Sequence, residues 1–378
     1  MNQQKKMKMK NYSMKYKIRM MVVALMVTAG TLVHAQTYTE NQKIERSFPA
    51  NSETRLEISN KYGTVHIIPW REDSVHIEID LFVKSSSNSK LEKLLRNIDF
   101  EFTDTRYYIV ATTSFGNKYN TFFSDLKDIS GSIIPSKNQV EINYTVHVPS
   151  GMNVNISNKY GDIYIDDMKG SVSINLSNGD LKANSLYGDA NISLNFGNGI
   201  INELGNARMN ISYADIEIRK VDQLNIESKS SYIRIQEAGI LKTNSRRDKY
   251  TINRIGNLFG ESWFSDILIY RMDEEINYSP SYGNLSLDTI PSGFSFINVN
   301  TQYSDLNMHF DAGASYILEV IRHDQVVLRI PEEYGDLEIT PQEDETAFIR
   351  GLIGNDSNPS SRVKITAPKK CFISIHKL

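Results

Sequence analysis

The sequence predicts an all-β fold: a single-stranded parallel β-solenoid (β-helix) with coils of 17–18 residues, irregular N- and C-terminal caps, and one short helix near residues 90–98. Two observations support this prediction. The string ISNKYG occurs twice, at Ile58 to Gly63 and at Ile156 to Gly161. From Gly151 onward, the chain divides into consecutive units of 18, 18, 18, 17, 17, 17, 17 and 18 residues. So regular a period indicates that each unit is one turn of chain stacked on the next.

Residues 1–35 are expected to be a secretory signal peptide rather than part of the fold. An apolar stretch from Met20 to Val33 follows a basic segment, and Val33 with Ala35 forms a small-residue cleavage site before Gln36. The basic segment contains Lys5, Lys6, Lys8, Lys10, Lys15, Lys17 and Arg19. An uncleaved membrane anchor is the alternative. The signal predicts export by the general secretory route to the periplasm, the cell surface or the medium, with no transmembrane segment after its removal.

Charge and cysteine content exclude several classes of protein. The whole chain has a formal net charge of -3, and without residues 1–35 it has 35 Lys and Arg against 45 Asp and Glu, a net charge of -10. A nucleic-acid partner is therefore not expected. The single cysteine, Cys371, excludes an intrachain disulfide and a cysteine zinc cluster, and it is expected to be a buried small apolar residue. The oligomeric state stays open.

The regular part of the solenoid is predicted to span residues 151–311. In the superimposed units, two positions separated by one residue are apolar almost throughout, which is the period of a strand with one buried face. The first position holds Ile163, Leu181, Gly199, Ile216, Ile233, Tyr250, Ile267 and Leu285, and the second holds Ile165, Ala183, Ile201, Ile218, Ile235, Ile252, Ile269 and Leu287. The last position of each unit predicts a second inward-facing corner: Met168, Leu186, Leu204, Val221, Ala238, Ile255, Met272 and Ile290.

A corner of the coil is predicted just before each of these strands. The position there holds mostly small residues: Gly161, Gly179, Gly197, Ala214, Ser231, Asp248, Ser265 and Gly283. We expect the glycine to make the tight turn, at a place where a larger side chain would obstruct the chain. The ISNKYG string is therefore interpreted as the sequence of such a corner, which recurs in altered form in the later units.

The two ends are predicted to be irregular coils and caps. Residues 36–150 carry the first ISNKYG, the short helix from Lys90 to Ile98, an inserted loop at 115–136 and the strand QVEINYTVHVP. Downstream of the eight units the coils are expected to lengthen, with corner motifs at Asp305 and Asp336, and residues 312–378 are expected to form C-terminal coils and a cap that include the closing strands RVKITAP and CFISIHKL. Terminal repeats commonly depart from the consensus because they must cover the ends of the stack.

An acidic position after the corner is the first candidate for chemistry. It holds Asp162, Asp180, Asn198, Asp215, Tyr232, Lys249, Asp266 and Asn284. Carboxylates one rung apart would have roughly the separation that retaining glycosidases use. However, Asp and Asn also stabilise turns by bonding their own backbone, and this interpretation is favoured because the two residues alternate here.

An aromatic position before the corner is the second candidate. It holds Tyr160, Asn178, Phe196, Tyr213, Ser230, Arg247, Phe264 and Tyr282, with Tyr62, Tyr303 and Tyr334 in matching places outside the units. Exposed rings could bind sugar rings or a partner surface. We expect instead that they stack on one another from rung to rung. Ser230 and Arg247 interrupt the series.

No motif in the sequence identifies a catalytic, cofactor-binding or metal-binding residue, so none is predicted. The remaining histidines are scattered and lack metal-ligand spacing: His66, His76, His147, His309, His323 and His376. His66 and His76 fall on predicted strands and are interpreted as structural. GxSxG, phosphate-binding loop and CxxC motifs are also missing from the sequence.

The corner strings NKYGTVHI, NKYGDIYI, SNGDLKA, PSYGNLSL and EEYGDLEI, with the VHVPSGMNVNIS segment, resemble exported adhesin-like proteins of Bacteroidota. These are proteins of unknown function related to the GIN-type auto-transporter adhesin head. The resemblance covers roughly Ile44 to the end. It implies a β-solenoid at the cell envelope and supplies no catalytic residues.

The sequence therefore favours a non-enzymatic exported protein, an adhesin or an envelope-associated binding or structural protein. Its expected partner is a protein or glycan ligand at the envelope. Two alternatives stay open: a carbohydrate-active β-helix enzyme, such as a polysaccharide lyase or hydrolase, and a periplasmic structural or signalling component. A cleft with convergent Asp, Lys or Arg side chains outside the acidic position would favour the enzyme.

Overall fold

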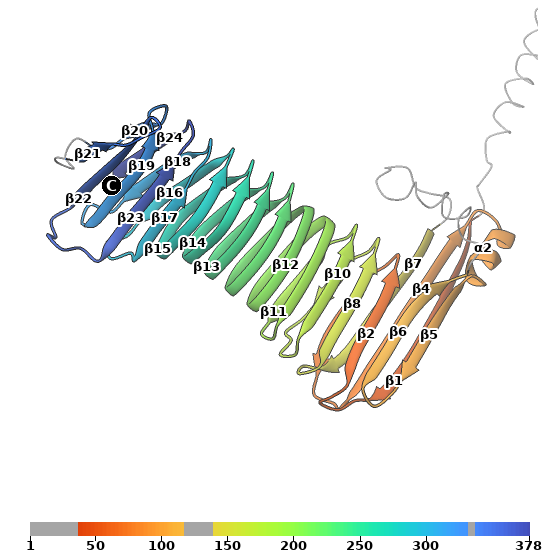
Figure 1. The fold of residues 1–378 in the computed structure, drawn as a ribbon. Helices are drawn as coiled ribbons and strands as arrows, with labels where there is room; N and C mark the ends of the chain where they lie inside the picture. The colour runs from red at the N-terminus through yellow and green to blue at the C-terminus, as the bar shows by residue number, and fades with distance from the viewer. Residues whose placement is uncertain (1–36, 117–138, 332–336) are drawn as a thin grey trace, which may run out of the picture.

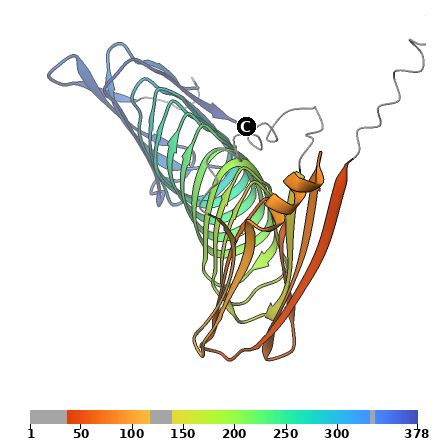
Figure 2. The same ribbon diagram turned by 90° about the vertical axis from the view of Figure 1, so that its right-hand side faces the viewer.

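A computed structural model describes residues 37–116, 139–331 and 337–378. The described residues are almost entirely β-strand and join into one 24-stranded sheet, with α2 as their one α-helix. The sheet winds around a common axis into a long rod, with β1 to β7 at one end and β19 to β24 at the other (Figures 1 and 2). The predicted signal peptide and most of the predicted loop at 115–136 lie outside the described residues.

The N-terminal end contains strands of mixed direction and the helix. Its elements are β1 (Tyr38–Pro49), β2 (Arg55–Lys61), β3 (Val65–Trp70), β4 (Ser74–Ser85), α2 (Asn88–Leu95), β5 (Ile98–Asp104), β6 (Tyr108–Phe115) and β7 (Gln139–Pro149). The helix begins after Ser87, whose hydroxyl oxygen accepts from the backbone N–H of Lys90. Leu91 and Leu94 are buried and place α2 over the core. The helix thus lies two to three residues earlier than expected.

The middle of the rod is built from parallel strands. Its elements are β8 (Asn153–Lys159), β9 (Ile163–Ile165), β10 (Val172–Ser177), β11 (Leu181–Leu186), β12 (Ala190–Lys229), β13 (Tyr232–Arg246), β14 (Lys249–Trp263), β15 (Asp266–Ser281), β16 (Asn284–Ile290), β17 (Phe296–Asn300) and β18 (Asp305–Phe310). Paired residues are 18 apart where Val172 faces Ala190, and 17 apart where Asp215 faces Tyr232. Below, a rung is one such turn of chain, and its corner is the bend between its two strand segments.

Each rung contributes two strand segments to the sheet, one on each side of the corner. The segment after the corner is the one that the alternating apolar positions predicted. The segment before it, such as β8 or β10, also pairs in parallel with its neighbours. Its apolar residues alternate in the same way, because Ile174 and Leu176 point inward while Asn175 is exposed.

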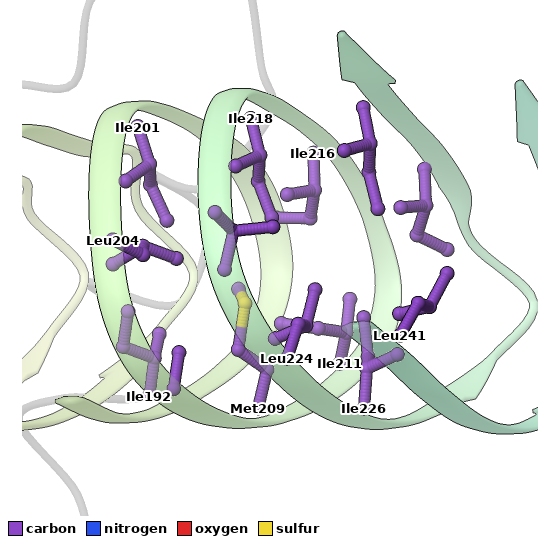
Figure 3. Packing of buried hydrophobic residues seen from close by; sticks show 14 of the residues in the cluster. Ile192, Ile201, Leu204, Met209, Ile211, Ile216, Ile218, Leu224, Ile226 and Leu241 are labelled. Carbon is purple, nitrogen blue, oxygen red and sulfur yellow. The ribbon is translucent and has the colours of Figure 1, made fainter. Parts of the chain in front are cut away.

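Isoleucine and leucine side chains fill the inside of the rod. The two predicted inward positions and the last position of each unit are buried in every rung, and the branched side chains stack along the axis (Figure 3). Because successive rungs place the same residue type at the same height, each buried column is continuous from rung to rung. The predicted core is therefore confirmed.

The two copies of ISNKYG are direct neighbours although 98 residues separate them. β2 pairs in parallel with β8, so that Ser59 faces Ser157 and Lys61 faces Lys159. On their outer side, β2 pairs with β6 and β3 pairs with β7. The strands β4 to β7 therefore lie beyond the first rung rather than between the two motifs, which the order of the sequence did not indicate.

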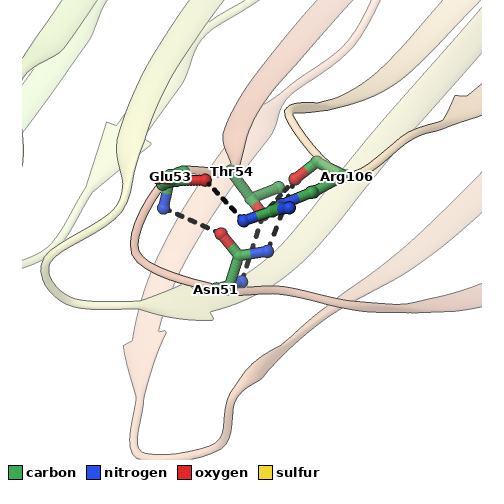
Figure 4. Close-up of polar contacts among 4 residues, drawn as sticks. All are labelled: Asn51, Glu53, Thr54 and Arg106. Atoms are coloured by element: carbon green, nitrogen blue, oxygen red, sulfur yellow. Dashed lines mark hydrogen bonds and ion pairs between the residues drawn. The ribbon is translucent and has the colours of Figure 1, made fainter.

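Contacts between loops tie the outermost N-terminal strands together (Figure 4). The Asn51 side chain accepts from the Glu53 backbone N–H at 2.8 Å and forms an Asx turn between β1 and β2. The Thr54 hydroxyl donates to the Arg106 carbonyl oxygen at 3.0 Å, and the Arg106 guanidinium lies 3.2 Å from the Glu53 carboxylate. The turn between β1 and β2 is thus held against the turn between β5 and β6.

The C-terminal end repeats this change of order. Its elements are β19 (Tyr316–His323), β20 (Val327–Arg329), β21 (Glu338–Pro341), β22 (Thr346–Ile353), β23 (Ser361–Ala367) and β24 (Phe372–Lys377). β23 pairs in parallel with both β17 and β19, and β24 with both β18 and β20. The last two strands of the chain therefore insert between two earlier rungs. The predicted closing strands exist, but they do not form the outermost rung.

Candidate functional site

From the rung of β2 and β3 to the rung of β17 and β18, one corner of each described rung has a left-handed backbone, and it is occupied by residues other than glycine. We call this series the corner ladder: Tyr62 (φ 67°), Tyr160 (60°), Asn178 (57°), Phe196 (60°), Tyr213 (54°), Ser230 (52°), Arg247 (59°), Phe264 (56°), Tyr282 (57°) and Tyr303 (54°). Left-handed backbone costs an L-residue about 1 kcal/mol or more. The repeated use of aromatic residues there indicates that another interaction offsets this strain.

The glycine that follows the ladder residue has a different role from the one expected. Positive φ belongs to the preceding aromatic residue, so the glycine does not make the turn. A Cβ at Gly161 would lie 2.0 Å from the Gly63 carbonyl oxygen, and one at Gly197 would lie 1.9 Å from the Gly179 carbonyl oxygen. At these two corners glycine is needed, because the preceding corner approaches too closely for a Cβ.

Rungs without a corner glycine replace it by a small or buried polar residue. The Ser231 hydroxyl accepts from the backbone N–H of Ala214 at 3.2 Å, and the Ser265 hydroxyl accepts from that of Asp248 at 3.1 Å. The buried Asp248 carboxylate accepts from the Ser231 and Arg246 backbone N–H groups and from two serine hydroxyls. These side chains satisfy backbone donors inside the rod.

The asparagine of ISNKYG is a buried structural residue. Asn158 donates to the carbonyl oxygens of Gly63 and Asp162 at 2.8 and 2.9 Å. Asn60 donates to the Ile142 carbonyl oxygen at 2.9 Å and accepts from the Thr113 hydroxyl at 3.1 Å. The motif therefore combines a buried amide, a left-handed tyrosine and a glycine in close contact with the next rung.

The acidic position after the corner also serves the backbone, but across rungs. Asp162 accepts from the Asp180 backbone N–H at 2.8 Å, and Asp180 accepts from the Asn198 backbone N–H at 2.9 Å. The expectation that these side chains bond their own backbone is thus corrected, because each reaches the following rung. The carboxylates are occupied by backbone donors in this role, and Asp215 pairs with Arg234 at 2.6 Å.

The aromatic residues of the corner ladder form parallel stacks, as expected. Ring centroids lie 5.5 Å apart for Tyr62 and Tyr160, and 5.0 Å apart for Phe196 and Tyr213. Phe264, Tyr282 and Tyr303 form a triple stack with spacings of 4.9 and 5.0 Å. Rings of the last two stacks keep 44–53% of their surface exposed. Stacking offsets the backbone strain and leaves the ring edges to solvent.

Asn178 separates the first two stacks, and two further ladder positions without rings, Ser230 and Arg247, separate the last two. Exposed cations surround this break: Lys229, Arg246, Arg247 and Lys249. None of the four forms an ion pair within the described residues. The interruption is visible in the sequence, and so is a basic residue before several ladder positions, at Lys61, Lys159, Lys229 and Arg246. The basic residue directly before the ladder position is the sequence feature that could have predicted the exposed cations at this break.

Two open hollows lie on the faces beside the ladder. One, of about 430 Å³, lies over β9, β11, β12 and β13 and includes Tyr164, Lys182, Ile200 and Arg219. The other, of about 340 Å³, lies over β12 and β13 and includes Arg208 and Lys242. Side-chain amides line both, and Asn202 donates to Asn184 at 3.0 Å within the first.

Most of the histidines are half-buried, and four of them lie in pairs: the ring centroids of His76 and His147 are 6.2 Å apart, and those of His309 and His376 are 4.7 Å apart. His76 forms a hydrogen bond with the Ser47 hydroxyl of neighbouring β1 at 2.8 Å, and it lies 3.3 Å from Glu78 on its own strand, β4. His323, Asp324 and Glu345 each present one ligand atom within 4.8 Å of the others. No local pattern indicates this group, because Glu345 reaches His323 and Asp324 only through the pairing of β19 with β22.

Burial raises the pKa of two kinds of side chain inside the rod. It raises the pKa of Tyr144 to about 12, although the Thr113 hydroxyl lowers it in part. It also raises the pKa of the Cys371 thiol to about 11. Cys371 is buried, as expected for a small apolar residue. The corner motif residues Tyr334 and Asp336 lie outside the described residues. In the described residues, no helix is long and apolar enough to span a bilayer.

Comparisons with known proteins give weak similarities. No protein-family model matches the sequence, and no curated protein matches it. A "putative lipid binding protein" from Parabacteroides distasonis is similar at 10% identity and a TM-score of 0.34, covering 72% of this chain and 93% of its own. A "putative adhesin" from Parabacteroides merdae has 13% identity and a TM-score of 0.27, covering 90% and 97%.

A "putative adhesin" from Parabacteroides distasonis, at 8% identity and a TM-score of 0.24, covers 89% of this chain and 97% of its own. Similarities this low assign neither a family nor an activity to the chain. Its function has to be argued from its own surface.

Proposed function

We propose that this chain is a non-enzymatic, exported β-solenoid of 17–18-residue coils that binds an extended partner at the cell envelope, as an adhesin or an envelope-associated binding protein. In this proposal residues 1–35 are the signal peptide and 36–150, 151–311 and 312–378 are the N-terminal coils, the regular array and the C-terminal coils. The partner is a protein or a glycan. The chain reaches the periplasm, the cell surface or the medium.

The observation that carries this proposal is the exposed corner ladder. Stacked rings at about 5 Å intervals form rigid amphipathic anchors along one edge of a rod. Large exposed apolar surface of this kind is typical of interaction sites. At the acidic position, which was the first candidate for enzyme chemistry, Asp162 and Asp180 accept from backbone N–H groups of the next rung.

Replacing ladder rings tests the proposal without disturbing the corner. Asparagine already occupies the ladder at Asn178, so the variant Phe196→Asn/Tyr213→Asn/Tyr282→Asn keeps a residue that tolerates positive φ. The control, Tyr187→Asn/Tyr270→Asn, removes exposed rings elsewhere. Labelled proteins are mixed with envelope preparations of the producing bacterium, and retained label is measured.

The proposal predicts that the wild type and the control bind and that the ladder variant loses most of its binding. Equal retention of all three proteins, or retention of none, contradicts it. Protease treatment of intact cells then separates surface display from a periplasmic location. Incubation with a panel of uronate-containing and neutral polysaccharides tests the enzyme alternative, since any new reducing end or unsaturated sugar would support it.

A further inference from the structure

The break in the corner ladder combines two ring faces on which no other ring stacks with cations that form no ion pair within the described residues. Within the described residues, Tyr213 stacks on Phe196 alone, and Phe264 stacks within the ladder on Tyr282 alone. Each therefore has one face without a ring against it. Three rung steps separate Tyr213 from Phe264, which corresponds to about 14 Å along the axis.

The cations project from the two rungs that form this break. Lys229 and Arg246 are paired residues of adjacent strands, and Arg246 is in turn paired with Trp263. Lys229 Nζ lies 5.8 Å from the Tyr213 ring centroid, which is within reach of a cation–π contact. Arg247 belongs to the ladder itself. The site thus places two successive rungs with cations between two rungs with rings, along one exposed edge.

The buried carboxylate beneath the break, that of Asp248, forms no ion pair with these four cations. Asp248, the nearest carboxylate in the sequence, is buried, and its oxygens accept from Ser228, Ser245 and two backbone N–H groups. Arg234, by contrast, is paired with Asp215 at 2.6 Å. The four cations of the break are consequently available to an external anion.

Flanking residues limit this positive surface to a short segment. Glu227 and Glu261 precede Lys229 and Trp263 by two positions on the same outward face, and Asp266 is the register partner of Lys249. A continuous basic track of the kind that binds nucleic acid is therefore interrupted on both sides. Exposed Tyr232 and Trp263 add further ring surface beside the cations.

We propose that this break, formed by Lys229, Arg246, Arg247 and Lys249 between the rings of Tyr213 and Phe264, binds an acidic polysaccharide. The cations bind its carboxylate or sulfate groups, and the ring faces contact the apolar faces of its sugars. The guanidinium groups favour such oxyanions because they donate two parallel hydrogen bonds. This site rests on the proposed function and names the chemistry of its partner.

Trp263 provides a direct signal for occupancy of the site. The chain contains two tryptophans, and Trp70 lies in the N-terminal region, where its indole N–H donates to the Ser74 carbonyl oxygen. In a Trp70→Phe background, fluorescence therefore reports Trp263 alone. Probes are polygalacturonate oligomers, sulfated dextran oligomers, neutral dextran oligomers, single-stranded DNA, and vesicles containing phosphatidylglycerol.

The test variant is Lys229→Gln/Arg246→Gln/Arg247→Asn, in which asparagine suits the left-handed position. The control Lys169→Gln/Arg362→Gln/Lys364→Gln removes the same number of exposed charges elsewhere on the rod. We expect the acidic oligosaccharides to change the fluorescence of the wild type and the control, with affinity that falls as salt is added. The test variant should bind them about tenfold more weakly, since three exposed ionic contacts are lost. Circular dichroism and thermal melting confirm that each variant folds.

Equal affinity of the test and control variants overturns the inference, as does equal binding of neutral and acidic dextran. Tighter binding of single-stranded DNA or of the vesicles also overturns it, in favour of those partners. If acidic oligosaccharides fail to bind while the wild type still binds envelope preparations, the inference fails and the proposed function stands. If neither binds, the proposed function itself is contradicted.

Discussion

At the scale of single residues, the corner explains why ISNKYG has its composition. The tyrosine adopts the left-handed backbone and gains a stacked ring, while the glycine admits the next rung at a distance that no Cβ could occupy. The asparagine binds backbone carbonyl oxygens inside the bend. Three neighbouring residues thus meet three separate physical requirements.

Gly161→Ala should be strongly destabilising, because its Cβ would overlap the Gly63 carbonyl oxygen at 2.0 Å and force two rungs apart. We expect a loss of at least about 2 kcal/mol in the free energy of unfolding, measured by denaturant titration. Gly151→Ala is the control, since nothing lies within 4 Å of its Cβ. Similar stability of the two variants would contradict this role of the glycine.

Glycine placed at the ladder itself should have opposite effects at two positions. Ser230 has φ 52° and no stacked ring, so Ser230→Gly relieves strain and should raise the unfolding free energy by about 0.5–1 kcal/mol. Tyr282 stacks on Phe264 and Tyr303, and Tyr282→Gly should lower it by about 1 kcal/mol because two ring contacts are lost. Thermal melting compares them. A stabilising Tyr282→Gly would show that stacking does not offset the strain.

At the scale of elements, each rung is stabilised by pairing with the rungs on either side. At the two ends of the rod, the order of the strands in the sheet differs from their order in the sequence. β23 and β24 insert between the rung of β17 and β18 and the rung of β19 and β20. β2 likewise lies between β6 and β8. At both ends, several strands that are neighbours in the sheet are therefore not neighbours in the sequence.

Removal of the last strand should consequently affect residues far from the C-terminus. A chain ending at Lys370 lacks β24, so Leu306 and Met308 of β18 lose the partners Ile373 and Ile375. We expect amide hydrogens of β18 and β20 to exchange faster by at least about tenfold, while those of β10 are unchanged. Mass spectrometry of exchanged peptides measures this. Unchanged exchange in β18 contradicts the inserted order.

Buried tyrosines inside the rungs should make the fold sensitive to alkali. The folded pKa of Tyr144 is raised from 10 to about 12, so its stabilising contribution is complete below pH 10 and is lost as pH rises toward 12. Burial also raises the pKa of Tyr250. Denaturant titration should give stability that falls between pH 10 and 12, with a shallower fall in Tyr144→Phe. Identical pH profiles of the two proteins would contradict this linkage.

The burial pattern of the regular array can be predicted from local sequence, whereas the strand pairing at the two ends of the rod cannot. Alternating apolar residues such as Ile216 and Ile218 predict their own burial, because the period of a strand is visible within a few residues. The pairing of Ser59 with Ser157 depends on contacts between residues 98 positions apart, which no local pattern contains. Stacking of Phe196 on Tyr213 was predictable from the repeat, but their positive φ was not, since glycine is the usual residue in that conformation.

At the scale of the whole molecule, the same repeated corner forms the bend of successive rungs and places exposed rings along one edge of the rod. Each corner sets the spacing of the strands, and the same residues that relieve its strain are presented to solvent. The corner ladder depends on the order of the rungs, since its first stack forms only if the two ISNKYG motifs are neighbours. Tyr62 reaches Tyr160 in no other arrangement.

A designed disulfide tests this order most directly. Ser59 and Ser157 are exposed register partners on adjacent strands, at a separation that suits a disulfide, whereas Asn175 lies one rung further on, about 10 Å from Ser59. Under mild oxidation, Ser59→Cys/Ser157→Cys should form an intramolecular bond that peptide mass spectrometry detects, while Ser59→Cys/Asn175→Cys should not. Failure of the first pair to cross-link, or equal cross-linking of both pairs, would contradict the stacked corner ladder.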